Sequence, residues 1–249
     1  MSALWFEADW PAPPGVRVLS TLRGAPGAGG VSRSPYAHFN LGDHVGDDAR
    51  AVAENRRHLQ VEARLPAEPS WLAQVHGTAV ADLDRLGSQA PADAAVARGA
   101  GRVCAILTAD CLPIVLATES GDRVAAAHAG WRGLAAGVIE ATVRVLEAPG
   151  TDLLAWLGPA IGPRHFEVGV EVREAFLKVD PAAAEAFEPN ARGRFMADLP
   201  RLARRRLENL GVTRIYGGGE CTFAQADRYY SHRRDGITGR QATLIWREG

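Results

Sequence analysis

The chain has 249 residues, of which 47% are hydrophobic and 23% are charged, and its formal net charge is −1. This length and hydrophobic share can supply the core of one large domain, so we expect residues 1–249 to form a single domain. A net charge near zero disfavours general binding to nucleic acid or to a membrane surface. We therefore expect neither of these partners.

The cysteine count and the N-terminus indicate a cellular compartment. The chain has three cysteines, an odd number, and its first residues lack a basic stretch followed by an apolar one. Both features are typical of a protein in a reducing compartment without a secretory leader. No window reaches the roughly 18 consecutive apolar residues of a membrane span. We expect a cytoplasmic monomer or homodimer.

The first third of the chain predicts one strand and one helix. Alternating apolar residues predict a strand at Val16–Thr21. Glycine and proline at 24–30 indicate a loop. A helix is expected over Asp48–Gln60, with Asp47 as its N-cap.

The middle of the chain predicts a cluster of strands followed by one long helix. Residues 119–122 have the composition of a tight turn, which predicts a hairpin between two of the strands. Leu134, Val138 and Leu146 fall on one helical face, which predicts a single helix over Gly133–Leu146. The expected strands are Ser70–Val75, Arg102–Thr108, Leu112–Thr118 and Arg123–Ala127.

The last third again mixes the two kinds of element. The expected helices are Val170–Lys178 and Pro200–Leu210. The expected strands are Asp152–Leu157, Arg194–Asp198, Thr213–Tyr216 and Gln241–Trp246. Because strands and helices do not alternate strictly, the pattern predicts an α+β fold with mixed sheets.

Three short motifs contain residues that bind soft metals: QVHGT around His76, TADCLP around Cys111 and AAHAGWRG around His128. Two imidazoles and one thiolate suit Zn²⁺, which favours nitrogen and sulfur donors. Three protein ligands leave a fourth position open, which is typical of a catalytic zinc site. The gaps of 35 and 17 residues between them are too long for a zinc finger. The fold must therefore bring these residues together.

The sequence segments around these residues resemble those of a known family. The segments FNLGDHVGDD, QVHGTAV, TADCLPIVL, AAHAGWRGLAAGV, LGPAIGP and SHRRDGITGRQA occur in this order. They resemble the YfiH family of laccase-domain, or peptidoglycan-editing, proteins over roughly residues 40–245. The resemblance implies four layers, with two packed mixed sheets and helices outside. One departure is His232, where many members have tyrosine.

The same resemblance implies an activity and a ligand set. It implies a cytoplasmic zinc enzyme that cleaves purine nucleosides, such as adenosine, inosine, guanosine and methylthioadenosine, with phosphate and also deaminates adenosine. The family's metal ligands carry over to His76, Cys111 and His128. Purine nucleosides and phosphate are the expected partners. Copper is the alternative metal for this donor set.

Five further residues are candidates for catalysis or substrate binding. Asp110 interrupts an apolar stretch, and a buried carboxylate is costly unless it is paired, so we assign it the proton transfer that deamination needs. Arg132 lies in the glycine-containing segment 128–133 that opens an expected helix. It could bind phosphate through two hydrogen bonds, or it could merely cover the start of the helix. Asn40 and His44 could contact the nucleoside or phosphate. Arg56 could face the site from its helix, although a solvated arginine is the default there.

The other two cysteines have different expected roles. Cys104 lies within an apolar run and is expected in the core. Cys221 follows three glycines and could form part of the wall of the site, but it is not expected to be a ligand. The glycines at 217–219 are themselves a candidate anion-binding segment.

Two other functions compete with the zinc enzyme, whereas the supply of ligands excludes a multicopper laccase. A multicopper laccase needs many histidines, usually in H-x-H pairs, whereas this chain has seven histidines and none two apart. A cysteine hydrolase would use Cys111 as nucleophile and His128 or His76 as base. The peptidoglycan-editing label suggests a non-catalytic partner in cell-wall precursor quality control.

Overall fold

The computed structural model describes residues 4–85 and 91–249. Its helices are α1 (Ala49–Glu62), α2 (Trp131–Ala136), α3 (Val138–Leu146), α4 (Val170–Leu177), α5 (Leu199–Asn209) and α6 (His232–Asp235), with 3₁₀ turns at Gly150–Asp152 and Pro181–Ala186. Its strands are β1 (Trp5–Glu7), β2 (Val16–Thr21), β3 (Ser70–Trp71), β4 (Val80–Asp82), β5 (Ala94–Ala97), β6 (Val103–Thr108), β7 (Leu112–Thr118), β8 (Val124–Ala129), β9 (Leu153–Leu157), β10 (Glu167–Val168), β11 (Phe187–Pro189), β12 (Phe195–Ala197), β13 (Arg214–Gly217) and β14 (Gln241–Arg247).

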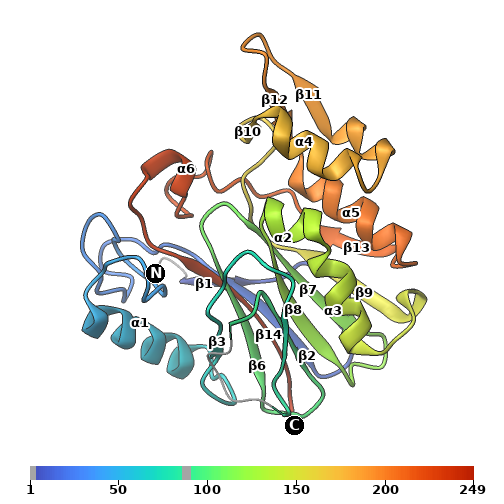
Figure 1. The fold of residues 1–249 in the computed structure, drawn as a ribbon. Helices are drawn as coiled ribbons and strands as arrows, with labels where there is room; N and C mark the ends of the chain where they lie inside the picture. The colour runs from blue at the N-terminus through green and yellow to red at the C-terminus, as the bar shows by residue number, and fades with distance from the viewer. Residues whose placement is uncertain (1–3, 86–90) are drawn as a thin grey trace.

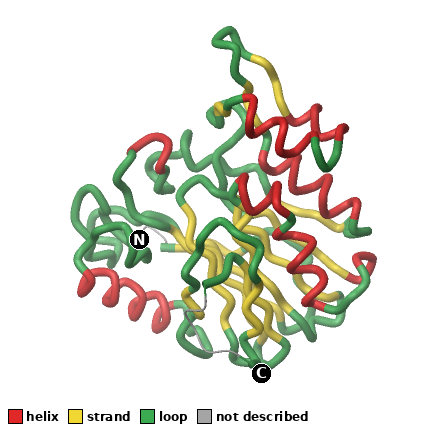
Figure 2. The backbone as a smooth tube through the Cα atoms, in the orientation of Figure 1, coloured by secondary structure: helices red, strands yellow, loops and turns green. Residues whose placement is uncertain are grey.

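The strands form three sheets. One has the order β1-β2-β14-β6-β3, the second has the order β13-β9-β7-β8-β5-β4, and a small sheet has the order β10-β12-β11. Both large sheets contain parallel and antiparallel pairs. Figure 2 shows the strands gathered in the middle of the molecule with most helices outside them. The α+β class with mixed sheets is confirmed.

The two large sheets pack against each other, because each has an apolar face on both sides. In β7, Val115 and Ala117 face the other large sheet, whereas Ile114 and Leu116 face the helices. This alternation follows from the two-residue repeat of a strand. Cys104 of β6 is fully buried between the sheets, as the sequence predicts.

Helices complete the outer layers (Figure 1). Helices α3 and α5 pack on the free face of the six-stranded sheet, and α1 packs on the other large sheet through Leu59. Helix α4 and the small sheet extend the helical side through Phe176 and Phe187. The four-layer α/β/β/α arrangement is therefore confirmed.

Several predicted elements differ in detail. The helix expected over Gly133–Leu146 is two helices, because Gly137 has φ +100° and interrupts the helical backbone. The expected strand at 70–75 ends at Trp71, and beyond it the side chain of Gln74, rather than its backbone, bonds to Leu107 N and O. Five short strands were not predicted, because none is longer than four residues and so none shows a clear alternation. They are β1, β4, β5, β10 and β11.

The prediction of Asp47 as the N-cap of α1 was wrong. The cap is Asp48, whose Oδ1 accepts a hydrogen bond from Arg50 N at 2.8 Å. Asp47 instead accepts from Asn40 Nδ2 at 2.9 Å, so it fixes the preceding loop. None of the helices in the described part of the chain is long and apolar enough to cross a membrane.

Candidate metal centre

The fold brings His76, Cys111 and His128 together. One donor atom from each lies within 4.8 Å of the other two, and His76 Nε2 is 3.7 Å from Cys111 Sγ. Tetrahedral zinc with ordinary bond lengths would place such a nitrogen and sulfur about 3.6 Å apart. Across residues 4–85 and 91–249 this is the one group of three or more such donors that could hold a metal ion.

Both large sheets contribute to this centre. Cys111 lies in the turn that leaves β6 in one sheet and enters β7 in the other. His128 is on β8 next to β7, where it pairs with Pro113, only two residues from Cys111. His76 follows β3 of the first sheet. The ligands are therefore assembled by sheet pairing rather than by their spacing in sequence.

Asp93 is the central supporting residue of the site, and the sequence reasoning missed it. Its carboxylate is fully buried and accepts a hydrogen bond from His128 Nδ1 at 2.8 Å. A carboxylate accepts but does not donate, so His128 is held with Nε2 available for the metal. Asp93 directly precedes the apolar strand β5, and an acid beside an apolar run is the signal that could have found it.

Asp93 also positions His76. It accepts hydrogen bonds from the backbone N–H groups of Val75, His76 and Gly77 at 3.2, 2.8 and 2.7 Å. His76 has φ +61°, a left-handed conformation that non-glycine residues rarely adopt. Three donors that converge on one anion stabilise this turn. Two of the three ligands thus depend on one carboxylate.

Two glycines leave room for the ligands. A Cβ on Gly130 would lie 2.8 Å from Cys111 Sγ and 3.0 Å from His76 Cδ2. A Cβ on Gly133 would lie 2.9 Å from the carbonyl oxygen of Gly77. Only glycine fits at both positions without displacing the ligand segments.

The electrostatics of the three residues and Asp93 favour a charged pair of Cys111 and His128. Burial raises the pKa of the Cys111 thiol, but His128 and His76 oppose it and lower the pKa to about 6. Burial lowers the pKa of His128, but Cys111 and Asp93 raise it to about 9. For Asp93, burial raises the pKa, while its hydrogen bonds from His128 and Gly77 outweigh this and lower it. Cys111 is thus already a thiolate near neutral pH, the form that binds metal.

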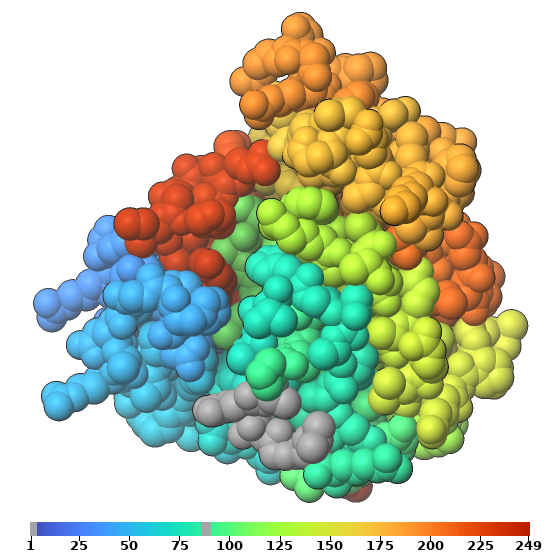
Figure 3. All heavy atoms as spheres, in the orientation of Figure 1, coloured from blue at the N-terminus to red at the C-terminus, as the bar shows by residue number. Residues whose placement is uncertain are grey.

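The centre opens to solvent on one side. His128 is 3% exposed, whereas Cys111 is half-buried and His76 is exposed. In the space-filling view, the red C-terminal segment, the cyan segment and lime-coloured α2 meet on one face (Figure 3). A small molecule can therefore approach the ligands from the His76 side.

Asp110, the candidate for proton transfer, lies beside Cys111 in the turn between β6 and β7. Its Oδ1 accepts from Thr222 Oγ1 and its Oδ2 accepts from Arg233 N, both at 2.7 Å. Its φ of +97° makes the turn sharp. Asp110 therefore ties the Cys111 turn to two C-terminal segments.

Asn40 and His44, two predicted substrate contacts, belong to one loop with different side-chain environments. Asn40 is fully buried, and its amide bonds to Gly42, Asp47 and Arg240. These bonds use its donors and acceptor within the protein. His44 is exposed beside Asp43, and its pKa is lowered by burial of part of the ring and by Arg240.

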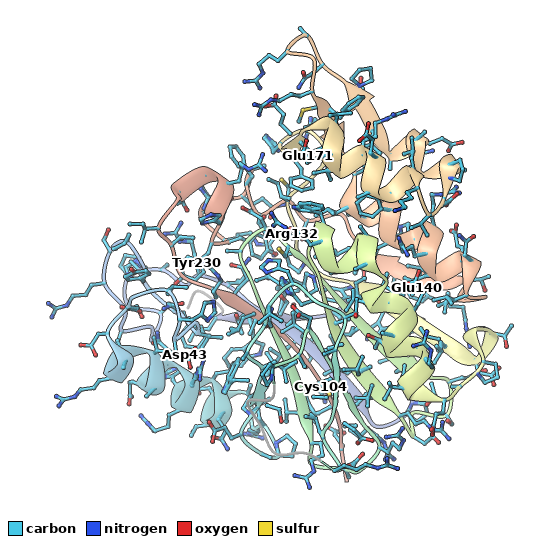
Figure 4. All side chains as sticks on the ribbon, in the orientation of Figure 1. Asp43, Cys104, Arg132, Glu140, Glu171 and Tyr230 are labelled. Atoms are coloured by element: carbon cyan, nitrogen blue, oxygen red, sulfur yellow. The ribbon has the colours of Figure 1, made fainter. Side chains whose placement is uncertain are left out.

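Arg56 and Arg132, the two predicted arginine contacts, lie apart. Arg56 donates to Leu41 O, lies 3.3 Å from Asp43 and packs over Trp71; it lines a surface pocket of ≈ 430 Å³ beside α1 that none of the metal ligands lines. Arg132 is exposed and packs on Trp131 at the start of α2. Figure 4 shows Asp43 on the α1 side and Arg132 on the α2 side of the molecule.

Cys221 and the glycines before it lie near the Asp110 segment. Cys221 Sγ is 3.5 Å from His165 Nδ1 and accepts from Gly162 N at 3.2 Å, and it is outside the metal-binding group. The next residue, Thr222, is the one that binds Asp110. Gly218 N donates to Leu157 O at 2.8 Å, so this backbone group is used by β9.

Residues 25–248 match the family model described as multi-copper polyphenol oxidoreductase laccase. The chain is 56% identical to the purine nucleoside phosphorylase of Pseudomonas aeruginosa, over 97% of this chain and 98% of that protein. It is 49% identical to the purine nucleoside phosphorylase YfiH of Escherichia coli, over 96% of both chains.

Solved structures of other proteins have the same fold. A Neisseria meningitidis protein of a family of unknown function is 46% identical, with a TM-score of 0.94 over 99% of this chain and 100% of that one. YlmD of Geobacillus stearothermophilus is 30% identical, with a TM-score of 0.92 over 100% of this chain and 98% of that one. The chain therefore belongs to the YfiH laccase-domain family.

Proposed function

We propose that this protein is a zinc-dependent purine nucleoside phosphorylase that also deaminates adenosine. The observation that carries the proposal is the convergence of His76, Cys111 and His128 on one open point in front of a buried carboxylate. A relative with 56% identity that is named a purine nucleoside phosphorylase supports the substrate class.

The donor set fits zinc. Two imidazole nitrogens and a thiolate, with one direction open to solvent, match the composition of catalytic zinc sites. When bound there, zinc would polarise a substrate oxygen or activate water. Asp93 keeps His128 in the tautomer and orientation that binding requires. The seven histidines of the chain are too few for a multicopper cluster, so copper would be a substitute at this same site.

The remaining roles belong to residues around the opening. Asp110 is the proposed proton carrier for deamination, because it is next to Cys111 and its side chain is not fully buried. His44 and Arg132 have exposed side chains and are the proposed contacts for nucleoside and phosphate. Asn40 and Arg56 support the His44 loop, one through its amide and the other through Leu41 and Asp43.

Metal analysis and a nucleoside assay test the proposal together. We expect purified protein to contain about one zinc per chain and to release purine base from nucleosides only when phosphate is present. Cys111→Ala should lose the metal and both activities, whereas Cys221→Ser should keep its metal. Full turnover by Cys111→Ala would refute the proposal.

The paired charges at Cys111 and His128 favour one alternative, a cysteine hydrolase. Alkylation separates the two functions. A zinc-bound thiolate is protected from iodoacetamide until a chelator removes the metal, whereas a free nucleophile reacts at once. Immediate alkylation of the metal-loaded protein at Cys111 would favour the hydrolase.

A further inference from the structure

Arg240 lies next to the metal centre, in the segment SHRRDGITGRQA that resembles the family. Gln241 at the start of β14 pairs with Thr108 at the end of β6. Arg240 and the turn that carries Asp110 and Cys111 therefore leave the sheet side by side. Consistent with this position, the charges of Cys111 and Asp110 both act on the Arg240 guanidinium.

The backbone of Arg240 is fixed on its other side by the His44 loop. Arg240 N donates to Asn40 Oδ1 at 2.8 Å, and Leu41 N donates to Arg240 O at 3.1 Å. A Cβ on Gly42 would lie 2.7 Å from Arg240 Cγ, so glycine at that position makes room for the arginine stem. Arg240 is thus held between the loop and the metal centre.

The guanidinium of Arg240 keeps part of its hydrogen-bonding capacity. Nη1 donates to the carbonyl oxygens of Thr238 and Gly239, both at 3.0 Å. Within residues 4–85 and 91–249, Nε and Nη2 have no hydrogen-bond partner and no carboxylate lies within 4.0 Å. Burial lowers the pKa of the group, but an arginine remains charged in proteins. A half-buried cation with an open face is suited to bind an oxyanion.

The neighbouring arginines are less suited to that role. Arg56 is engaged by Asp43 and Leu41 and packs on Trp71. The backbone N–H of Arg233 donates to Asp110, and its side-chain Nη1 donates to Glu167 O. Arg56 is therefore committed to protein groups, and the Arg233 side chain is exposed, whereas Arg240 is half-buried beside the metal centre.

Given the phosphorylase activity and the Arg132 contact proposed above, we propose that Arg240 also binds the inorganic phosphate that attacks the nucleoside. An oxygen of hydrogen phosphate forms a bond to the anomeric carbon of the ribose while the bond from that carbon to the purine nitrogen breaks. The electron pair of the broken bond goes to the purine, which takes up the proton released from hydrogen phosphate. The products are the free base and ribose 1-phosphate. Arg240 holds the phosphate through Nε and Nη2.

Arg240→Met tests this role, with Arg240→Lys as the conservative variant. Loss of two charge-assisted hydrogen bonds should raise the KM for phosphate about tenfold or more. Arg240→Lys should fall between this variant and the wild type, because it keeps the charge without the planar pair of donors. At a fixed phosphate concentration, the ratio of phosphorolysis to deamination should fall as the KM for phosphate rises.

Binding without turnover supplies a second measurement. Inorganic phosphate should raise the melting temperature of zinc-loaded wild-type protein, and this shift should be lost in Arg240→Met. Arg204→Met is the matched control. Arg204 lies on α5, away from the metal centre, and its guanidinium also donates only to carbonyl oxygens, those of Ile215 and Gly217. It should keep the phosphate shift.

Two results would overturn the role of Arg240. One is an unchanged KM for phosphate together with an unchanged phosphate shift in Arg240→Met. The other is a parallel loss of zinc and of all activity, which would show a structural role. If the wild type fails to cleave nucleosides, the proposed function fails, but the phosphate shift still tests Arg240 by itself.

Discussion

Asp93 connects the metal-ligand segments through its two carboxylate oxygens. Oδ1 accepts from His76 N and His128 Nδ1, and Oδ2 accepts from Val75 N and Gly77 N. Its own carbonyl oxygen also accepts from His128 N at 2.6 Å. A single residue thus sets the orientation of one imidazole and the backbone turn that presents another.

Replacing Asp93 by asparagine should weaken metal binding. The amide has one oxygen, so its NH₂ group must face at least one of the four N–H donors. We expect the affinity for zinc to fall about 10–100-fold and the free energy of unfolding to fall by about 3 kcal/mol. Competition against a chromophoric chelator measures the first quantity, and urea denaturation measures the second.

Asp84→Asn is the control for this experiment. Asp84 also accepts hydrogen bonds from two backbone N–H groups, those of Arg98 and Gly99, but it contacts no metal ligand. It should lose stability without losing zinc affinity. An Asp93→Asn protein that binds zinc as tightly as the wild type would contradict the role assigned to this carboxylate.

Gly130 provides a second test at the level of one residue. Its φ of −60° suits alanine, so Gly130→Ala adds only the clash with Cys111 Sγ and His76 Cδ2. Because metal sites tolerate ligand displacements of only about 0.5 Å, we expect zinc affinity to fall about tenfold or more. A chelator titration measures it. Gly219→Ala, where a new Cβ meets nothing within 4 Å, should bind zinc normally. Equal affinities in both variants would argue against a crowded centre.

The sequence could identify the three candidate metal ligands but not the residues that support them. His76, Cys111 and His128 lie in sequence motifs that resemble those of the family, and the structure brings all three residues together. Asp93 and Arg240 make their contacts through sheet pairing with β8 and β6, and such pairing is not visible along the chain. Asn40 is the opposite case: the sequence suggested a contact with substrate, but its side chain bonds within the protein to Gly42 N and Arg240 N.

At the scale of elements, long strands with clear alternation were predictable. Val16–Thr21 and Leu112–Thr118 have the bounds that their apolar patterns indicate. Strands of two to four residues, such as β4 and β5, are too short for a period to appear. The break between α2 and α3 escaped the periodicity, because Leu134, Val138 and Leu146 are all buried on either side of it.

Gly137 should be required for that break. Its φ of +100° is unfavourable for residues with a Cβ, so Gly137→Ala should lower the free energy of unfolding by about 1–2 kcal/mol. Gly137→Asn should cost less, because asparagine tolerates positive φ better. Urea denaturation of both variants gives the comparison. If alanine and asparagine are equally destabilising, the backbone conformation is not the cause.

At the scale of the whole molecule, the metal centre joins the two large sheets. His76 follows a strand of the five-stranded sheet, His128 belongs to the six-stranded sheet, and Cys111 lies in the turn between them. The apolar core between the sheets already holds them together. A bound ion would add a link at the open end of that core, and this link exists only in the folded chain.

Metal binding should therefore raise global stability. An ion that binds only the folded state at 100 times its dissociation constant contributes about 2.7 kcal/mol. In a chain of this size, that corresponds to a rise in melting temperature of about 5–10 °C. Calorimetry of the wild type with zinc and with excess chelator measures the difference. Cys111→Ala should melt at one temperature under both conditions, because it lacks the thiolate. A zinc-induced rise of the same size in Cys111→Ala would place the stabilising ion elsewhere on the protein.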